Sequence, residues 1–197
     1  MASTIEKIKQ LREETAAGMM DVKRALEETD GDVDGARKVL RERGQAIAAK
    51  KSSREATEGL IDAYIHFNGR VGVLVEVKCE TDFVARTPEF KEFAHNVALH
   101  VASANPQPVA VGSEDIPADV VAEERQIAET QAANMGKPEN VQAKIVEGRM
   151  KKFVSEQALL TQPYVKATDK TVGDLLQDTI QRVGENVVIR RFVRYEL

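Results

Sequence analysis

Few residues in this chain have the types and spacing that bond-making chemistry needs. The sequence has a single cysteine, Cys79, and the histidines His66, His95 and His100. His95 and His100 are five positions apart on one predicted helix, roughly 140° apart around its axis, so they cannot clamp a metal ion by themselves. Cys79 ends a valine-rich strand, where a small buried thiol is more typical than a nucleophile. Glycine-rich phosphate loops, dinucleotide fingerprints and nucleophile elbows are all missing. We therefore expect no cofactor, no metal site and no enzymatic reaction.

The run 79–86 instead has the character of a protein-binding corner. Alternating valines over 71–77 predict a strand before it, and the Thr-Pro-Glu sequence at 87–89 predicts a helix start after it. An acid and a large aromatic, Asp82 and Phe83, therefore lie at an exposed junction between strand and helix. The plainer interpretation is that Thr81 or Asp82 caps a helix and Phe83 fills the core.

A second segment, 15–26 with the sequence TAAGMMDVKRAL, is equally distinctive. At least one of Met19 and Met20 is expected to fill the core, while the other can be exposed. Thioether side chains adapt to irregular surfaces, so a methionine loop beside Arg12 and Lys23 would suit docking on a helix of a partner.

Together the two segments resemble those of the bacterial elongation factor Ts family, in its short form. The resemblance continues in GRMKKF at 148–153, QPYV at 162–165 and RRF at 190–192, and it covers essentially the whole chain. It implies a translation elongation factor that acts as a guanine-nucleotide exchange factor. Such a factor binds elongation factor Tu with GDP, dislodges Mg²⁺ and promotes GDP release so that GTP can bind.

The resemblance also implies two sets of site residues. The set for dislodging Mg²⁺ from the partner is Thr81, Asp82, Phe83 and Val84. Within it, Phe83 would be a wedge and Asp82 a polar contact or a cap of the corner. The set for docking on the partner's nucleotide-binding domain is Arg12, Met19, Met20 and Lys23. Exchange of this kind needs no bond chemistry, because a factor that prefers the nucleotide-free partner already promotes release.

Helical periodicity predicts a three-helix module in residues 1–45. Residues 3–6 fit a capping box, and a first helix runs from there to the break at 15–18. A second helix is predicted over 19–29, and Asp32 is placed to cap a third that stops at Gly44. The size of the module and its Gly-Met connection resemble the ubiquitin-associated fold, which the family uses at its N-terminus. Residues 46–58 are predicted to be a polar linker, whose composition also permits a helix.

The periodicity changes to two after Gly59, and residues 59–197 are predicted to form an α+β core domain. The resemblance implies that this domain binds the partner and dimerises. Residues 60–66 and 70–79 alternate around an Asn-Gly turn, as in a β-hairpin. Helices are predicted over 88–101, 117–135, 138–153 and 171–183, with a short extended piece at 159–165. A last strand at 186–195 is expected to join the hairpin. The expected fold class is α+β, with an antiparallel sheet covered on one face by helices.

Composition limits the classes of protein. The chain has 197 residues, 42% of them hydrophobic, which is enough to bury a core. Charges near the N-terminus and the lack of a long apolar run predict a cytoplasmic protein that does not enter a membrane. The net charge of −4 argues against direct binding of nucleic acid. Since Cys79 is alone, an intrachain disulfide is excluded.

Other functions stay open from the sequence. One is an adaptor that binds ubiquitin or a similar protein through the helical module, without exchange activity. Another is an RNA-binding translation protein that uses the strand at 190–194, although the low aromatic content of 5% argues against this function. A third is an enzyme. The single core of the short form also predicts a homodimer that pairs its sheets or their exposed faces. The apolar residues of the last strand that motivate it are Val187, Val188, Ile189, Phe192 and Val193.

Overall fold

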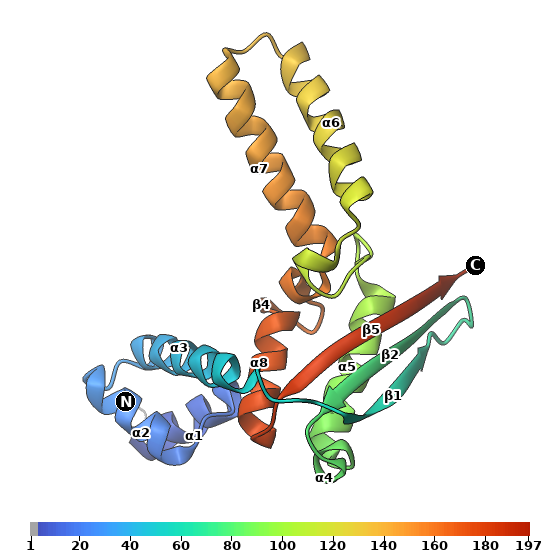
Figure 1. Ribbon diagram of the computed structural model, residues 1–197. Coiled ribbons are helices and arrows are strands. Elements are labelled where there is room, and N and C mark those ends of the chain that lie inside the picture. Colours follow the sequence, from blue (N-terminus) through green and yellow to red (C-terminus); the bar gives the residue numbers. More distant parts are fainter. Residues whose placement is uncertain (1–3) are drawn as a thin grey trace. The chain divides into compact units, whose positions relative to one another are not determined.

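The computed structural model describes residues 4–197 (Figure 1). Ser3 of the predicted capping box lies outside the described residues. The fold divides into two compact units. The first holds the described residues up to Asp62, together with Glu76–Asn96 and Asp174–Arg190. The second holds Ala63–Val75, Val97–Gly173 and Arg191–Leu197.

Three helices open the first unit: α1 (Thr4–Thr15), α2 (Met19–Glu28) and α3 (Val33–Lys51). The Asp32 carboxylate caps α3 as predicted, accepting hydrogen bonds from the amides of Asp34 at 3.2 Å and Gly35 at 3.1 Å. The helices share a buried cluster of Leu11, Ala17, Val22, Ala25, Leu26, Ala36 and Leu40. Whether residues 1–45 also behave as a separate domain stays a prediction.

The predicted end of the third helix at Gly44 is wrong, because α3 continues to Lys51. Gly44 is buried in the helix, and a Cβ built on it would lie 3.1 Å from Oε1 of Gln181 on α8 (Val172–Val183). The glycine therefore leaves room for a side chain of α8 against α3, and it does not terminate the helix. One turn earlier, Arg41 donates to both carboxylate oxygens of Asp174 on α8 at 2.7 Å.

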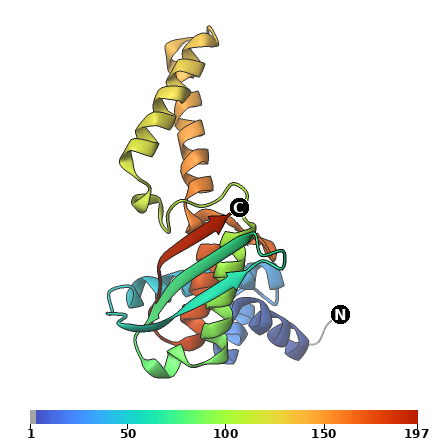
Figure 2. The ribbon, with the colours of Figure 1, turned by 90° about the vertical axis from the view of Figure 1, so that its right-hand side faces the viewer.

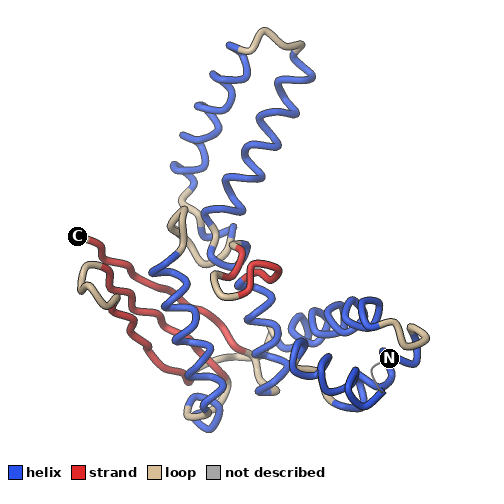
Figure 3. The backbone as a smooth tube through the Cα atoms, turned by 180° about the vertical axis from the view of Figure 1, so that it is seen from behind, coloured by secondary structure: helices blue, strands red, loops and turns tan. Residues whose placement is uncertain are grey.

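The predicted hairpin is present as β1 (Glu58–Ile65) and β2 (Val71–Cys79), and β5 (Val187–Glu196) completes an antiparallel sheet of order β1-β2-β5 (Figure 3). Gly69 adopts the positive φ of 67° that the turn requires. The amide of His66 donates to the carbonyl of Val71 at 2.9 Å, so the loop between these residues is longer than a two-residue turn.

One side of β2 is buried, as its alternation predicts. The buried positions are Val73, Val75, Val77 and Cys79. A short helix, α4 (Asp82–Ala85), and a long one, α5 (Pro88–Ser103), follow β2. An apolar stripe along α5 is also buried, namely Phe90, Phe93, Ala94, Val97 and Val101. The α+β class is thereby confirmed, with one side of the sheet turned to helix and the other to solvent.

The second unit contains a helical hairpin of α6 (Ala118–Asn134) and α7 (Glu139–Gln157), which lie side by side (Figures 1 and 2). Their buried cluster is Ala128, Ala132, Val146 and Met150. Arg149 of α7 donates to Glu124 of α6 through Nε at 2.8 Å. Near the start of α7, Val141 is 37% exposed, whereas Val146 further along is buried.

The predicted extended piece at 159–165 is right only in part. Leu159–Thr161 forms a turn of 3₁₀ helix, and β3 (Pro163–Tyr164) pairs antiparallel with β4 (Ala167–Thr171). The polar sequence of β4 has no apolar alternation that would have predicted a strand. Another short 3₁₀ helix spans Ser113–Asp115. No helix in the described part of the chain is both long and apolar enough to cross a membrane.

Candidate partner-binding sites

The predicted corner after β2 is a tight, internally bonded turn into α4. The Thr81 hydroxyl oxygen caps α4 by accepting from the amide of Val84 at 3.4 Å. The Thr81 carbonyl accepts from the amide of Ala85 at 3.3 Å. Of the two residues considered as caps, Thr81 therefore has this role and Asp82 does not. Asp82 is exposed and pairs with Arg86 one turn later, with 2.8 Å between Oδ2 and Nη2.

Phe83 points outward from this corner. Its side chain is 82% exposed, so the interpretation that it fills the core is wrong. Val84, the next residue, is only 9% exposed and turns inward. The Val84 carbonyl also accepts from the Thr87 hydroxyl at 2.8 Å, which ties α4 to the start of α5. Among the four candidate residues of the corner, Phe83 thus carries the accessible apolar surface and Val84 the attachment to the core.

Glu185, which no pattern in the sequence singled out, supports the corner from the turn between α8 and β5. Its Oε2 accepts from the amides of Glu80 at 3.1 Å and Thr81 at 3.0 Å, and its Oε1 accepts from the Thr81 hydroxyl at 2.7 Å. No local pattern could have revealed this contact, since more than a hundred positions separate the partners. Three donors on one carboxylate make a rigid attachment.

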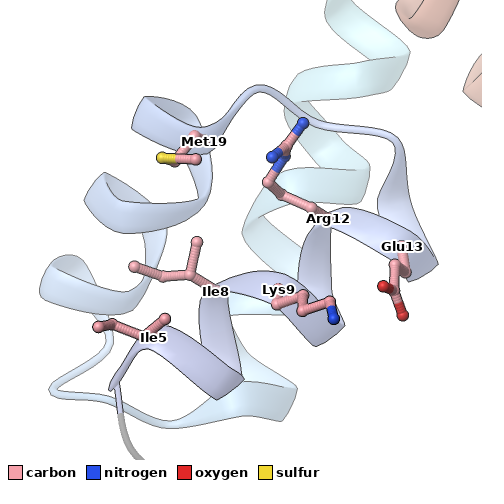
Figure 4. Close-up of a pocket in the computed structure, with 6 residues that line it drawn as sticks. All are labelled: Ile5, Ile8, Lys9, Arg12, Glu13 and Met19. Atoms are coloured by element: carbon pink, nitrogen blue, oxygen red, sulfur yellow. The ribbon is translucent and has the colours of Figure 1, made fainter.

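A second candidate surface lies on α1 and α2. A groove of about 580 Å³ is lined by Ile5, Ile8, Lys9, Arg12, Glu13 and Met19 (Figure 4). Met19 is 57% exposed and Met20 is 62% exposed, so the expectation that one of them fills the core is wrong. The core positions nearest the methionines are Ala17 and Val22, one on either side.

The four predicted docking residues share α1 and α2 but not one cavity. Arg12 and Met19 line the groove, and Met20 is not among its lining residues. Lys23 forms an exposed pair with Glu27, with 3.7 Å between Nζ and Oε1. It lines a smaller hollow of about 250 Å³ beside Leu26 and Asp30. The structure therefore offers an apolar groove whose lining includes the basic Lys9 and Arg12, and which contains residues beyond the four first singled out.

Cys79 immediately precedes the corner and is buried. Its thiol donates to the Thr81 carbonyl at 3.2 Å. Burial, followed by the nearby carboxylate of Glu185, raises the pKa of the Cys79 thiol to about 11. The thiolate is thus disfavoured at neutral pH, in keeping with a structural role.

His100 is buried in the second unit with both ring nitrogens engaged. Its Nδ1 accepts from the amide of Val165 at 3.3 Å. Nε2 must then carry the proton and donate to Oε1 of Gln162 at 3.0 Å. Burial lowers the pKa of His100, and the Gln162 hydrogen bond opposes this shift. The neutral ring therefore joins α5 to the segment around β3.

Comparison with known proteins gives matches along the whole chain. A family model described as Elongation factor TS matches residues 2–197. Elongation factor Ts of Rubrobacter xylanophilus is 73% identical over 197 residues, covering 100% of both chains. Elongation factor Ts of Carboxydothermus hydrogenoformans is 56% identical over 194 residues, which cover 98% of this chain and 88% of the relative. For the Elongation factor Ts of Desulfosudis oleivorans the identity is 52% over 190 residues, or 96% of this chain and 95% of the relative. With a match of this extent over its whole fold, the chain belongs to the elongation factor Ts family of translation elongation factors.

Proposed function

We propose that this chain is a cytoplasmic guanine-nucleotide exchange factor for elongation factor Tu, and that it works by binding, without being an enzyme. The observation that carries the proposal is the display of Phe83, 82% exposed on a capped corner. Large aromatic side chains at interfaces anchor in pockets of the partner and contribute most of the binding energy. Membership of the elongation factor Ts family supports an elongation factor as that partner.

The corner suits the removal of Mg²⁺ from the partner's nucleotide site. A GTPase holds its nucleotide through backbone amides, a lysine and a Mg²⁺ ion bridged to the phosphates. Phe83 acts as a wedge that displaces the elements supporting the ion. Asp82 makes a polar contact beside it, while Thr81 and Val84 hold the wedge in place from within the corner. Binding that favours the nucleotide-free partner weakens nucleotide affinity by the same factor, as linkage requires.

The groove on α1 and α2 provides the docking surface. Its occupant in this proposal is an amphipathic helix of the nucleotide-binding domain of elongation factor Tu. Ile5 and Met19 offer exposed apolar surface, at 78% and 57%, to the apolar face of such a helix. Arg12 in the groove and Lys23 in the smaller hollow are basic, so acidic side chains on the partner would complement them. Met20 extends the apolar surface next to Met19.

A homodimer completes the proposal. In the second unit, the solvent side of the sheet carries four large apolar side chains at Ile65, Leu74, Val193 and Tyr195, exposed by 66%, 46%, 39% and 71%. We propose that a second copy of the chain covers these side chains. Each chain has a single core, so a two-fold dimer would contain two. Light scattering at micromolar concentration should give a dimer, and Leu74→Lys should shift it to monomer. A monomeric parent chain would contradict this part of the proposal.

The exchange activity is tested with elongation factor Tu loaded with fluorescent GDP and chased with unlabelled nucleotide. Adding this chain should accelerate the loss of signal. The alternative of a ubiquitin-associated-type adaptor is favoured by the groove alone. It predicts binding of a helical partner through α1 and α2 with an unchanged rate of GDP loss. Equal rates with and without the chain would therefore overturn the exchange proposal.

A further inference from the structure

We infer that Glu185 is a positioning residue for exchange: its carboxylate holds the corner in the geometry that displays Phe83. This inference rests on the proposed function of Phe83 as the wedge. Glu185 itself lies in the turn between α8 and β5, directly after Gly184, whose φ of 79° turns the chain out of α8. The α8–β5 turn therefore delivers a carboxylate to the end of a strand far away in sequence.

The carboxylate satisfies donors that the sheet leaves open. β2 ends at Cys79, so the amides of Glu80 and Thr81 lie beyond its last strand residue. Both donate to Oε2 of Glu185, at 3.1 Å and 3.0 Å. Amides at such a junction need a partner when they are shielded from water, and a charged acceptor makes a stronger bond than a neutral one. Glu185 thus fixes the backbone of the two residues that lead into α4.

The same carboxylate controls the helix cap. A threonine hydroxyl has one proton, and the Thr81 hydroxyl donates it to Oε1 of Glu185 at 2.7 Å. Its oxygen is left to accept from the amide of Val84 in the first turn of α4, at 3.4 Å. Glu185 therefore sets the rotamer of Thr81, and Thr81 in turn orients α4. Phe83 is the exposed residue inside that turn.

A reciprocal contact shows that the corner and the α8–β5 turn are built as a pair. Oε1 of Glu80 accepts from the amide of Asn186 at 2.6 Å. The Asn186 side chain, 3% exposed, donates to the carbonyl of Arg54 at 2.7 Å. Each strand end thus supplies one carboxylate to the backbone of the other. Because the links run in both directions, sliding of either segment would break hydrogen bonds on both.

The decisive experiment is a double-mutant cycle on stimulated GDP release at saturating factor. Glu185→Ala should lower the rate by about fivefold to tenfold, the scale of a lost charge-assisted hydrogen bond. In a Phe83→Ala background the same substitution should change the rate by less than about twofold, because a misplaced wedge and an absent wedge are equivalent. Additive losses would mean that Glu185 acts independently of Phe83 and would overturn the inference.

Two further variants separate positioning from general stability. Glu185→Gln keeps one oxygen for the amides of Glu80 and Thr81 but loses the acceptor of the Thr81 hydroxyl, so its rate should lie between those of the parent and Glu185→Ala. Asp174→Asn, at the other end of α8, weakens the pair with Arg41 without touching the corner and should retain the parental rate. Amide hydrogen exchange by NMR should show faster exchange at Thr81 in Glu185→Ala but not in Asp174→Asn.

The outcomes for this inference and for the proposed function are distinct. If the parent chain does not accelerate GDP release, the proposed function fails and the positioning role fails with it. If the parent is active and Phe83→Ala is defective, but Glu185→Ala matches the parent, only the positioning role fails. Unchanged exchange of the Thr81 amide in Glu185→Ala would also overturn it, whatever the rates.

Discussion

Replacing Phe83 with alanine removes the side chain on which the proposed exchange mechanism depends. A covered phenylalanine buries about 200 Å², so covering the 82% that is exposed would remove about 160 Å² from water, worth about 4 kcal/mol. Only the part of this energy that appears during release affects the rate, and about 1.4 kcal/mol is sufficient for a tenfold change. We therefore expect Phe83→Ala to reduce stimulated GDP release at least about tenfold at saturating factor.

The fold should survive this change. The part of Phe83 already covered in the free chain amounts to about 40 Å², or about 1 kcal/mol of unfolding free energy. A phenylalanine that filled the core would instead cost about 3–5 kcal/mol on truncation. Thermal unfolding of Phe83→Ala should consequently stay within a few degrees of the parent, while the release assay changes.

The matched control is Phe67→Ala, in the loop of the β1–β2 hairpin. Phe67 is 92% exposed, so its replacement by alanine removes the same side chain from a comparably exposed position. Its release rate should equal that of the parent. A Phe83→Ala variant that unfolds like the parent and still releases GDP at the parental rate would refute the wedge. Equal losses in both variants would point to nonspecific apolar contact instead.

Three other predictions follow from the sites described above. Changing Met19 and Met20 together to serine should raise the concentration of factor for half-maximal stimulation about tenfold and leave the saturating rate intact. The control is Met135→Ser, because Met135 is 53% exposed on the α6–α7 hairpin. A changed saturating rate in the double variant would contradict a docking role. The lowered pKa of His100 means that the unfolded chain binds a proton first as pH falls below 6.5, so the unfolding free energy should fall there by at most about 1.4 kcal/mol per pH unit. Unfolding midpoints measured between about pH 7.5 and 5.5 test this, and the unfolding free energy should depend less on pH in His100→Gln than in the parent. An equal pH dependence in the two proteins would mean that another group causes it. With the pKa of Cys79 at about 11, alkylation by iodoacetamide at about pH 8 should be slow in the folded chain and fast in denaturant, and fast labelling of the folded chain would show the thiol to be open.

Local periodicity was sufficient to predict the elements that build the corner. Alternation in β2 and the apolar stripe of α5 are both set by which side faces the core, so they are visible in the residue order. The capping role of Thr81 is equally local, since the hydroxyl bonds an amide three residues later. The outward direction of Phe83 was harder to predict from the sequence, because the residue that caps a turn does not determine which side chain of that turn is exposed.

Contacts between segments that are distant in the chain could not be predicted from the sequence. Gly44 carries the signal of a helix end, and only the nearness of Gln181 shows that it serves packing. Glu185 has no distinctive neighbours in the chain, although it accepts three hydrogen bonds at the corner. The exposure of both methionines could not be predicted for a related reason. Whether position 19 or 20 faces the core depends on the angle at which α2 leaves the preceding turn, and in the structure neither does.

The shortness of α4 limits how the corner can be imitated. A helix of four residues is far below the length at which an isolated helix is stable in water, about 12–15 residues. A linear peptide copied from 79–90 would therefore sample many conformations and lose affinity to ordering entropy. An inhibitor that copies this corner needs a covalent brace in place of the strand end, such as a macrocycle closed across it. The useful unit for transplantation is the corner together with the turn that clamps it.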